Sequence, residues 1–288
     1  MICDYQTNKV YLAEGLKHYM PLCWNLISAL EKEGIAYCFL PRTKSEKHVW
    51  ARDYMPIQIE KDKYLRYRYE PDYLWGFEDY IPDYPAIDKD LNLDCKSTDI
   101  ILDGGNVIKC GNKVIMTDKV LKENRYRHKK KLISKLEDLI QAEIVLIPWD
   151  KYEEFGHADG MVRYIEGNRV LMNNYAKFDP LFREKLIDAL IPHFKLEEFF
   201  YYTPRHSQYS WAYINFLQIG TTIFVPGLGI DEDLFAVGKI EAIYPNHKVI
   251  KIDGCQDLVR DGGALNCVTW NIMCDLPEKE NEVLPNTK

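Results

Sequence analysis

The stretch LDGGNVIKCGNKVIMT, residues 102–117, combines a glycine-rich turn with two short apolar segments. The segments NVIKC and KVIMT flank a Gly-Asn pair, a pattern typical of two strands joined by a tight turn. Apolar residues at helical spacing follow over 125–142, and a third apolar segment, EIVLIP, covers 143–148. The stretch therefore predicts a unit of strand, strand, helix and strand that begins at the motif LDGG.

Five short motifs occupy similar settings along the chain and recur at nearly constant spacing. They are WARDYMP around Asp53, LDGGNV around Asp103, GHADGMV around His157, YSWAYINF around Tyr213 and DGGALNC ending at Cys267. Their anchor residues are 50, 54, 56 and 54 positions apart. A period of this size predicts a supersecondary repeat. The order of strand, strand, helix and strand recurs after GHADGMV and again after YSWAYINF.

The two ends of the chain complete the repeat pattern. The last apolar segment, NCVTWNI at 266–272, has no partner downstream, whereas NKVYLAEGL at 8–16 precedes a helical pattern at 21–34 and a strand at 35–41. Pairing of the last strand with the first would close the repeats into a ring. We therefore expect a single domain over 1–288 with an α+β fold, a five-bladed propeller of ββαβ repeats.

One segment departs from the repeat. Residues 70–98 are rich in proline, aspartate and aromatic residues, and they predict an irregular loop insertion in place of a helix. Loops of this kind often cover functional sites.

A closed ring would bring residues some 50 positions apart together at its central axis. We expect a cluster of one thiol, one imidazole and several carboxylates there: Cys267, His157, Asp53, Asp103 and Asp159. The cluster contains a nucleophile, a general acid and base, and groups that bind cations.

Composition indicates the class of protein and of partner. The 288 residues are 47% hydrophobic and 28% charged, as in an ordinary soluble globular protein. The net charge of −7 and the absence of a long Lys/Arg run argue against nucleic acid or an anionic membrane as a partner, and favour a cationic substrate. No signal-peptide pattern and no stretch of about 18 apolar residues occurs, which predicts a cytoplasmic protein. A homodimer is left open.

The eight cysteines are scattered without CxxC pairs or Cys/His zinc spacing, so we expect them to be free thiols. Cys255 and Cys274 lack a glycine-rich setting and are expected to be structural. GHAD supplies a single histidine and GLGIDED lacks the pattern of a phosphate-binding loop, so neither a metal site nor a cofactor is expected.

The five motifs resemble, in order, those of the guanidine-modifying or pentein superfamily, and most closely those of agmatine deiminases and Porphyromonas-type peptidylarginine deiminases. WARD is similar to the W-x-R-D of that family, DGGN to its acidic-GGN, GHAD to its G-H-x-D, and GGALNCVT to its glycine-rich run ending in cysteine. The resemblance extends over nearly the whole chain and implies the pentein fold. Three stretches depart from it: DYMP replaces D-x-G-P, Asp103 replaces glutamate, and GGALNC has fewer glycines.

The resemblance implies a role for four residues. Cys267 would attack the guanidinium carbon, and His157 would protonate the departing amine and then activate water. Asp53 and Asp159 would hold the planar cation through paired N–H bonds, a task suited to carboxylates. The products would be a ureido compound and ammonia, formed through a thiouronium intermediate.

Three further residues are candidates for substrate binding. Asp103 could instead cap the GGN turn, Trp50 could pack in the core, and Asn215 could bond a strand end. The first candidate substrate is a small guanidine such as agmatine, which would give N-carbamoylputrescine for putrescine synthesis. Arginine in peptides, amidino transfer to an amine acceptor, and a non-catalytic binding module are the alternatives.

Overall fold

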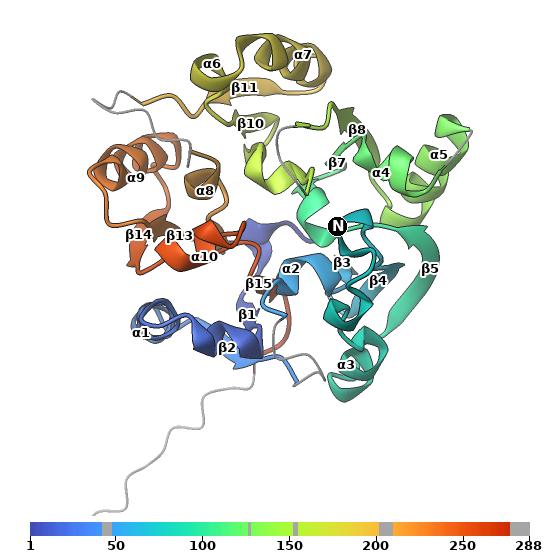
Figure 1. Cartoon of the computed structure of the whole chain (residues 1–288), viewed down its shortest axis with the longest axis horizontal. Helices are drawn as coiled ribbons and strands as arrows, with labels where there is room; N and C mark the ends of the chain where they lie inside the picture. Colours follow the sequence, from blue (N-terminus) through green and yellow to red (C-terminus); the bar gives the residue numbers. More distant parts are fainter. Residues whose placement is uncertain (42–47, 126–127, 152–154, 202–209, 277–288) are drawn as a thin grey trace, which may run out of the picture.

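The computed structural model describes residues 1–41, 48–125, 128–151, 155–201 and 210–276. Within these ranges the strands form five three-stranded sheets, which are arranged around a common centre (Figure 1). The sheets have the orders β15-β1-β2, β3-β4-β5, β6-β7-β8, β9-β10-β11 and β12-β13-β14. In each sheet the first pair is antiparallel and the second pair is parallel. The predicted pentein-type α+β repeat is therefore confirmed.

The strands are short, and most coincide with the apolar segments of the sequence. Their bounds are β1 (Lys9–Leu12), β2 (Ala36–Phe39), β3 (Ile57–Glu60), β4 (Lys63–Arg68), β5 (Cys95–Ile101), β6 (Ile108–Cys110), β7 (Lys113–Thr117), β8 (Glu143–Ile147), β9 (Val162–Glu166), β10 (Arg169–Met172), β11 (Lys195–Glu198), β12 (Leu217–Ile219), β13 (Thr222–Gly227), β14 (Lys248–Asp253) and β15 (Thr269–Ile272).

One longer helix links the second and third strands of each sheet, because a parallel pair needs a crossover. These helices are α1 (Leu22–Lys32), α3 (Tyr84–Asp90), α5 (Lys129–Ile140), α7 (Pro180–Leu190) and α9 (Glu232–Ile243), and they lie on the outside of the arrangement (Figure 1). In α5 the buried residues Leu132, Leu136 and Ile140 recur every fourth position and form the face that packs inward.

The first and last strands of the chain share a sheet. Val10 lies opposite Asn271, and Leu12 opposite Thr269, in the antiparallel pair of β1 and β15. The side chain of Asn8 extends the pairing, since it bonds the backbone N–H and carbonyl of Cys274. The predicted pairing of the two ends of the chain is confirmed.

Residues 70–98 are more regular than the sequence suggested. They contain the 3-10 turns η3 (Asp72–Leu74) and η4 (Glu78–Tyr80), the helix α3, and the start of β5. Asp83 caps α3 by accepting from the N–H of Ala86, and Pro85 occupies the first turn, where its missing N–H costs nothing. The expectation of an irregular loop in place of a helix is therefore wrong for residues 84–90.

The motifs themselves form short turns just before the first strand of a sheet. These turns are α2 (Ala51–Tyr54), η5 (Gly104–Asn106), η6 (Ala158–Gly160) and α8 (Ser210–Ile214). In the fourth motif the residues Ser210–Ile214 form α8, and the strand β12 begins only at Leu217. Because α2 contacts η5, η5 contacts η6, and η6 contacts α8, the turns line up around the centre.

The remaining short elements are η1 (Asp4–Gln6), η2 (Glu14–His18), α4 (Lys119–Glu123), α6 (Tyr175–Phe178) and α10 (Gln256–Arg260). None of the helices in the described ranges has the length and apolar character needed to span a bilayer.

Candidate active site

The glycines of the DGGN motif allow the turns to approach closely. A Cβ atom on Gly104 would lie 1.9 Å from the backbone oxygen of Arg52, and one on Gly105 would lie 2.7 Å from both Asp53 Oδ1 and His157 Nδ1. Only a residue without a side chain fits at these two positions. The motif thus brings three repeats into contact at the centre.

The Cys267 thiol lies among polar side chains from two other repeats. Its Sγ atom is 3.2 Å from Asn215 Oδ1 and 3.7 Å from Asp159 Oδ2. The carbonyl of Cys267 accepts from the N–H of Arg52 at 3.0 Å, which fixes the thiol-bearing loop against α2. The cysteine, one candidate carboxylate and Asn215 are therefore brought together.

The His157 ring lies between two carboxylates. Its Nε2 atom is 2.8 Å from Asp103 Oδ2, and its Nδ1 atom is 3.6 Å from Asp53 Oδ1. Asp53 Oδ1 also accepts from the N–H of Gly105 at 3.1 Å. Both ring nitrogens therefore face an acceptor, an arrangement that favours the protonated imidazolium.

The electrostatics of these groups follow from burial and like charge. Burial alone would lower the pKa of His157, but the carboxylates of Asp53, Asp103 and Asp159 outweigh it and raise this pKa to about 10. Burial raises the pKa of Asp53 to about 7, with help from the other two carboxylates and against the effect of His157. Burial, and then Asp159 and Asp53, raise the pKa of the Cys267 thiol well above its usual range. The free thiol is therefore protonated.

A cavity of about 490 Å³ opens beside the thiol. Its described lining includes the four candidate residues His157, Asp159, Asn215 and Cys267. Aromatic side chains and one more acid form other parts of the wall: Asp150, Phe155, Tyr175, Phe178 and Trp211. Among the lining residues that the structure describes there is no lysine or arginine. The cavity therefore suits a cationic ligand with an apolar portion.

The chain's family follows from comparison with known proteins. A sequence model of the Porphyromonas-type peptidyl-arginine deiminases matches residues 42–272. The chain belongs to this deiminase family. No curated protein matches the sequence significantly.

Solved structures share the fold at low sequence identity. The agmatine deiminase of C. jejuni, solved with substrate bound, superimposes with a TM-score of 0.74 over 96% of each chain at 18% identity. The agmatine deiminase of Enterococcus faecalis gives a TM-score of 0.75 over 96% of each chain at 16% identity. DDAH from Pseudomonas aeruginosa gives 0.62 at 13% identity, over 93% of this chain and all of that one. The expected resemblance to guanidine-modifying hydrolases is thereby confirmed.

Three of the sequence-based candidates are not among the described residues of the cavity wall, and one of them, Asp53, lies beside the His157 ring instead. Trp50 is not among the described residues of the cavity wall; its ring packs on Gly263, where an added Cβ would lie 2.1 Å from it. Asp103 is 1% exposed and pairs with His157 rather than lining the described part of the cavity. The structure therefore gives Trp50 a packing role and Asp103 a contact with the imidazole.

A lysine that no sequence motif indicated lies next to the candidate site. Lys119 is 1% exposed, with its Nζ atom 2.5 Å from the carbonyl of Phe155 and 4.0 Å from Asp103 Oδ2. It also pairs at 3.3 Å with Asp72, in the 70–98 segment. The neighbouring Tyr73 ring packs edge-on against His157, so this segment reaches the candidate site. A single lysine on a short helix gives no sequence pattern from which its position beside the candidate site could be predicted.

Within the described ranges, no group of three or more His, Cys, Asp or Glu side chains has the arrangement of a metal site.

Proposed function

We propose that this chain hydrolyses a small cationic guanidine, agmatine or a close analogue, to a ureido product and ammonia. The observation that supports it is the meeting of a thiol, an imidazole and a carboxylate at one cavity: Cys267, His157 and Asp159 all line it. These are the groups needed for covalent hydrolysis of a guanidinium carbon, which is a poor electrophile unless it is held and attacked by a strong nucleophile.

In the first half of the proposed reaction, Asp159 and Asp53 hold the guanidinium plane by accepting its N–H bonds. The Cys267 thiol releases its proton to solvent when the cationic substrate binds, and the resulting thiolate adds to the central carbon. Protonated His157 then gives its proton to one nitrogen, the C–N bond breaks, and ammonia leaves. The carbon remains bonded to sulfur as a thiouronium ion.

In the second half, neutral His157 removes a proton from water as the water oxygen adds to the carbon. The C–S bond breaks, sulfur leaves with the bonding electron pair, and the hydroxyl proton of the intermediate passes to the departing thiolate, which regenerates the thiol and gives an N-substituted urea. Asp103 keeps the imidazole in place throughout, through its contact with Nε2. For agmatine the product is N-carbamoylputrescine.

The bound substrate itself favours the reactive form of the thiol. Burial, and then the carboxylates of Asp159 and Asp53, raise the pKa of Cys267 in the absence of substrate. A guanidinium placed against the same carboxylates neutralises them and brings a positive charge close to sulfur, so the pKa of the thiol falls.

The lining of the cavity bears on the far end of the substrate. A free arginine would bring a carboxylate, yet the described wall contains Asp150 and aromatic rings, with no lysine or arginine. An ammonium tail is more compatible with this wall, because carboxylates and aromatic faces both attract cations. Arginine within a peptide is the second candidate, which the match to the peptidyl-arginine deiminase family favours.

The test is a panel of agmatine, free arginine, blocked arginine peptides and methylated arginines, assayed for ureido product and for ammonia. The proposal expects equal amounts of both products, with agmatine giving the highest kcat/KM. Highest kcat/KM with blocked arginine peptides would identify the second candidate. Product formed only with an added amine acceptor, and without ammonia, would indicate an amidinotransferase. If none of these compounds is turned over, the remaining alternative is a non-catalytic binding module.

A further inference from the structure

The side chain of Asn266 joins the candidate active site to Arg163, with which it lines a second, small pocket. Its Oδ1 atom accepts from Arg163 Nη1 at 3.1 Å, and its Nδ2 atom donates to Asp159 Oδ2 at 2.8 Å. The three residues are each at most 3% exposed. Since Asp159 Oδ2 also lies 3.7 Å from Cys267 Sγ, the contacts run without a break from Arg163 to the thiol.

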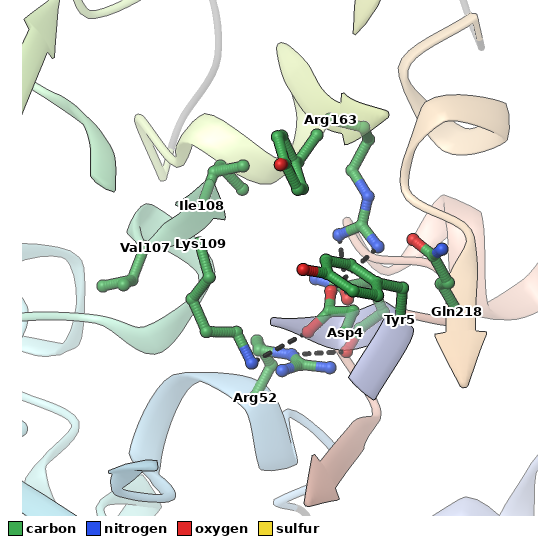
Figure 2. Close-up of a pocket in the computed structure, with 10 residues that line it drawn as sticks. Asp4, Tyr5, Arg52, Val107, Ile108, Lys109, Arg163 and Gln218 are labelled. Carbon is green, nitrogen blue, oxygen red and sulfur yellow. Dashed lines mark hydrogen bonds and ion pairs between the residues drawn. The ribbon is translucent and has the colours of Figure 1, made fainter. Parts of the chain in front are cut away.

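The guanidinium of Arg163 is itself held from several directions. Figure 2 shows Arg163 and Lys109 reaching the same carboxylate, Asp4, from different elements. The distances are 3.2 Å from Arg163 Nη2 and 2.8 Å from Lys109 Nζ. The Arg163 guanidinium also lies 4.6 Å from the centre of the Phe216 ring. It is therefore a fixed donor, anchored in the small pocket behind the site.

A fixed donor at this position determines the orientation of the amide. Arginine can only donate hydrogen bonds, and an ionised carboxylate can only accept them. Of the two orientations of the Asn266 amide, one satisfies both neighbours, and the other places like groups against each other on both sides. Without Arg163, Oδ1 would be a buried acceptor lacking this partner, and the amide would no longer be restricted to the orientation that serves Asp159.

We propose that Arg163 is a positioning residue which, through Asn266, holds the Asp159 carboxylate in the orientation that grips the guanidinium beside Cys267. The inference rests on the proposed function, in which Asp159 binds substrate. Arg163 is not among the described residues of the cavity wall, and it acts on Asp159 through Asn266. Asn266, the residue before the cysteine, therefore contributes to the geometry of the site as the link between Arg163 and Asp159.

The chain offers a matched control. Arg163→Met and Lys109→Met each remove a cation that pairs with Asp4, but of these two cations it is Arg163 that also donates to the side chain of Asn266. Steady-state assays on the full chain should show kcat/KM for agmatine falling ten- to hundredfold in Arg163→Met and less than about threefold in Lys109→Met. Equal losses in the two variants, with melting temperatures lowered alike, would mean that Arg163 is merely structural.

Two further variants keep the proposal testable if Arg163→Met folds poorly. Asn266→Asp can still pair with Arg163 but places a second carboxylate against Asp159, so it should fold and still lose at least tenfold in kcat/KM. The double variant Arg163→Met/Asn266→Ala should be no worse than Asn266→Ala alone, because both changes break one chain of contacts. Wild-type activity in Asn266→Asp, or additive losses in the double variant, would overturn the positioning role.

The outcomes also separate this role from the proposed function. Absence of guanidine turnover by the wild-type protein would overturn both. Turnover by the wild type with no difference between Arg163→Met and Lys109→Met would overturn the positioning role alone.

Discussion

Replacing Asp103 with asparagine tests whether this residue serves the imidazole or the substrate. Asp103 Oδ2 lies 2.8 Å from His157 Nε2, and Asp103 is one of the three carboxylates that raise the pKa of His157 to about 10. A hydrogen bond to a charged group contributes about 1.5–3 kcal/mol. That amount corresponds to about one to two pKa units. Since a carboxylate stabilises the protonated ring, Asp103→Asn should lower the pKa of His157 by this amount.

The assay is the pH dependence of kcat/KM, supported by an NMR titration of the His157 ring. In wild type the imidazolium is present up to its pKa and is lost as pH rises through it. The alkaline limb should therefore move to lower pH by about one to two units in Asp103→Asn. Turnover should also fall about tenfold or more, because the neutral side chain orients the ring less firmly.

The matched control is Asp72→Asn. Asp72 also pairs with Lys119, at 3.3 Å, but it is 42% exposed and its other ion pair is with Lys122. This variant should keep the wild-type pH profile. If the alkaline limb does not move in Asp103→Asn and KM rises, Asp103 does not serve the His157 imidazole, and a role in substrate binding would be favoured instead.

Three other substitutions have definite expected outcomes. Cys267→Ser should fold normally and lose all turnover, whereas Cys274→Ser should remain active; the reverse result in steady-state assays would exclude Cys267 as nucleophile. Asp53→Asn should lower kcat by orders of magnitude, yet melt at or above the wild-type temperature at pH 8. In wild type, an ionised Asp53 carboxyl whose pKa is raised to about 7 destabilises the folded state at pH 8. The higher melting temperature of the variant should therefore vanish below pH 3.8, where this carboxyl is protonated in both the folded and the unfolded state. A strongly lowered melting temperature would indicate a structural role. Gly105→Ala should lose activity at least tenfold, since the new methyl group collides with Asp53 and His157; wild-type kcat/KM would contradict the close approach.

Most of the fold could be predicted from the sequence, because the repeat imposes the same local chemistry several times. The segment KVIMT is the strand β7 from end to end, and its flanking Gly-Asn turn joins it to β6 as expected. The pairing of the two ends of the chain could also be predicted, since an apolar strand at each end lacked a partner. The helix over 84–90 was missed because its prolines and aspartates read as loop signals, although Asp83 caps the helix and Pro85 fits its first turn.

The sequence could predict which residues lie at the centre, but not which side chains they contact there. A central position for Asp53, His157 and Cys267 follows from the repeat spacing. Their partners depend on side-chain directions across different repeats, and a linear pattern does not contain that information. The contacts of Asp103 with His157, and of Arg163 with Asn266, therefore became visible only in three dimensions.

The charges of the empty site indicate how the proposed reaction is confined to bound substrate. His157 lies 3.6 Å from Asp53 Oδ1 and 2.8 Å from Asp103 Oδ2, and Lys119 lies 4.0 Å from the same oxygen of Asp103. Because the pKa of His157 is high, the imidazolium is a weak proton donor, and Cys267 remains a protonated thiol. A guanidinium held by Asp53 and Asp159 competes with the imidazolium for the same negative charge, so the pKa of His157 falls toward that of a useful acid.

The same guanidinium lowers the pKa of Cys267, so one binding event prepares both the acid and the nucleophile. This reasoning makes a further prediction: the thiol should react slowly with iodoacetamide in the free protein, and its reaction should accelerate in Asp159→Asn, which removes the carboxylate 3.7 Å from sulfur. Rates measured from pH 6 to pH 10 should rise at lower pH in the variant than in wild type. Identical rate profiles would mean that burial alone controls the thiol, and the coupling between substrate charge and nucleophile would then have to be abandoned.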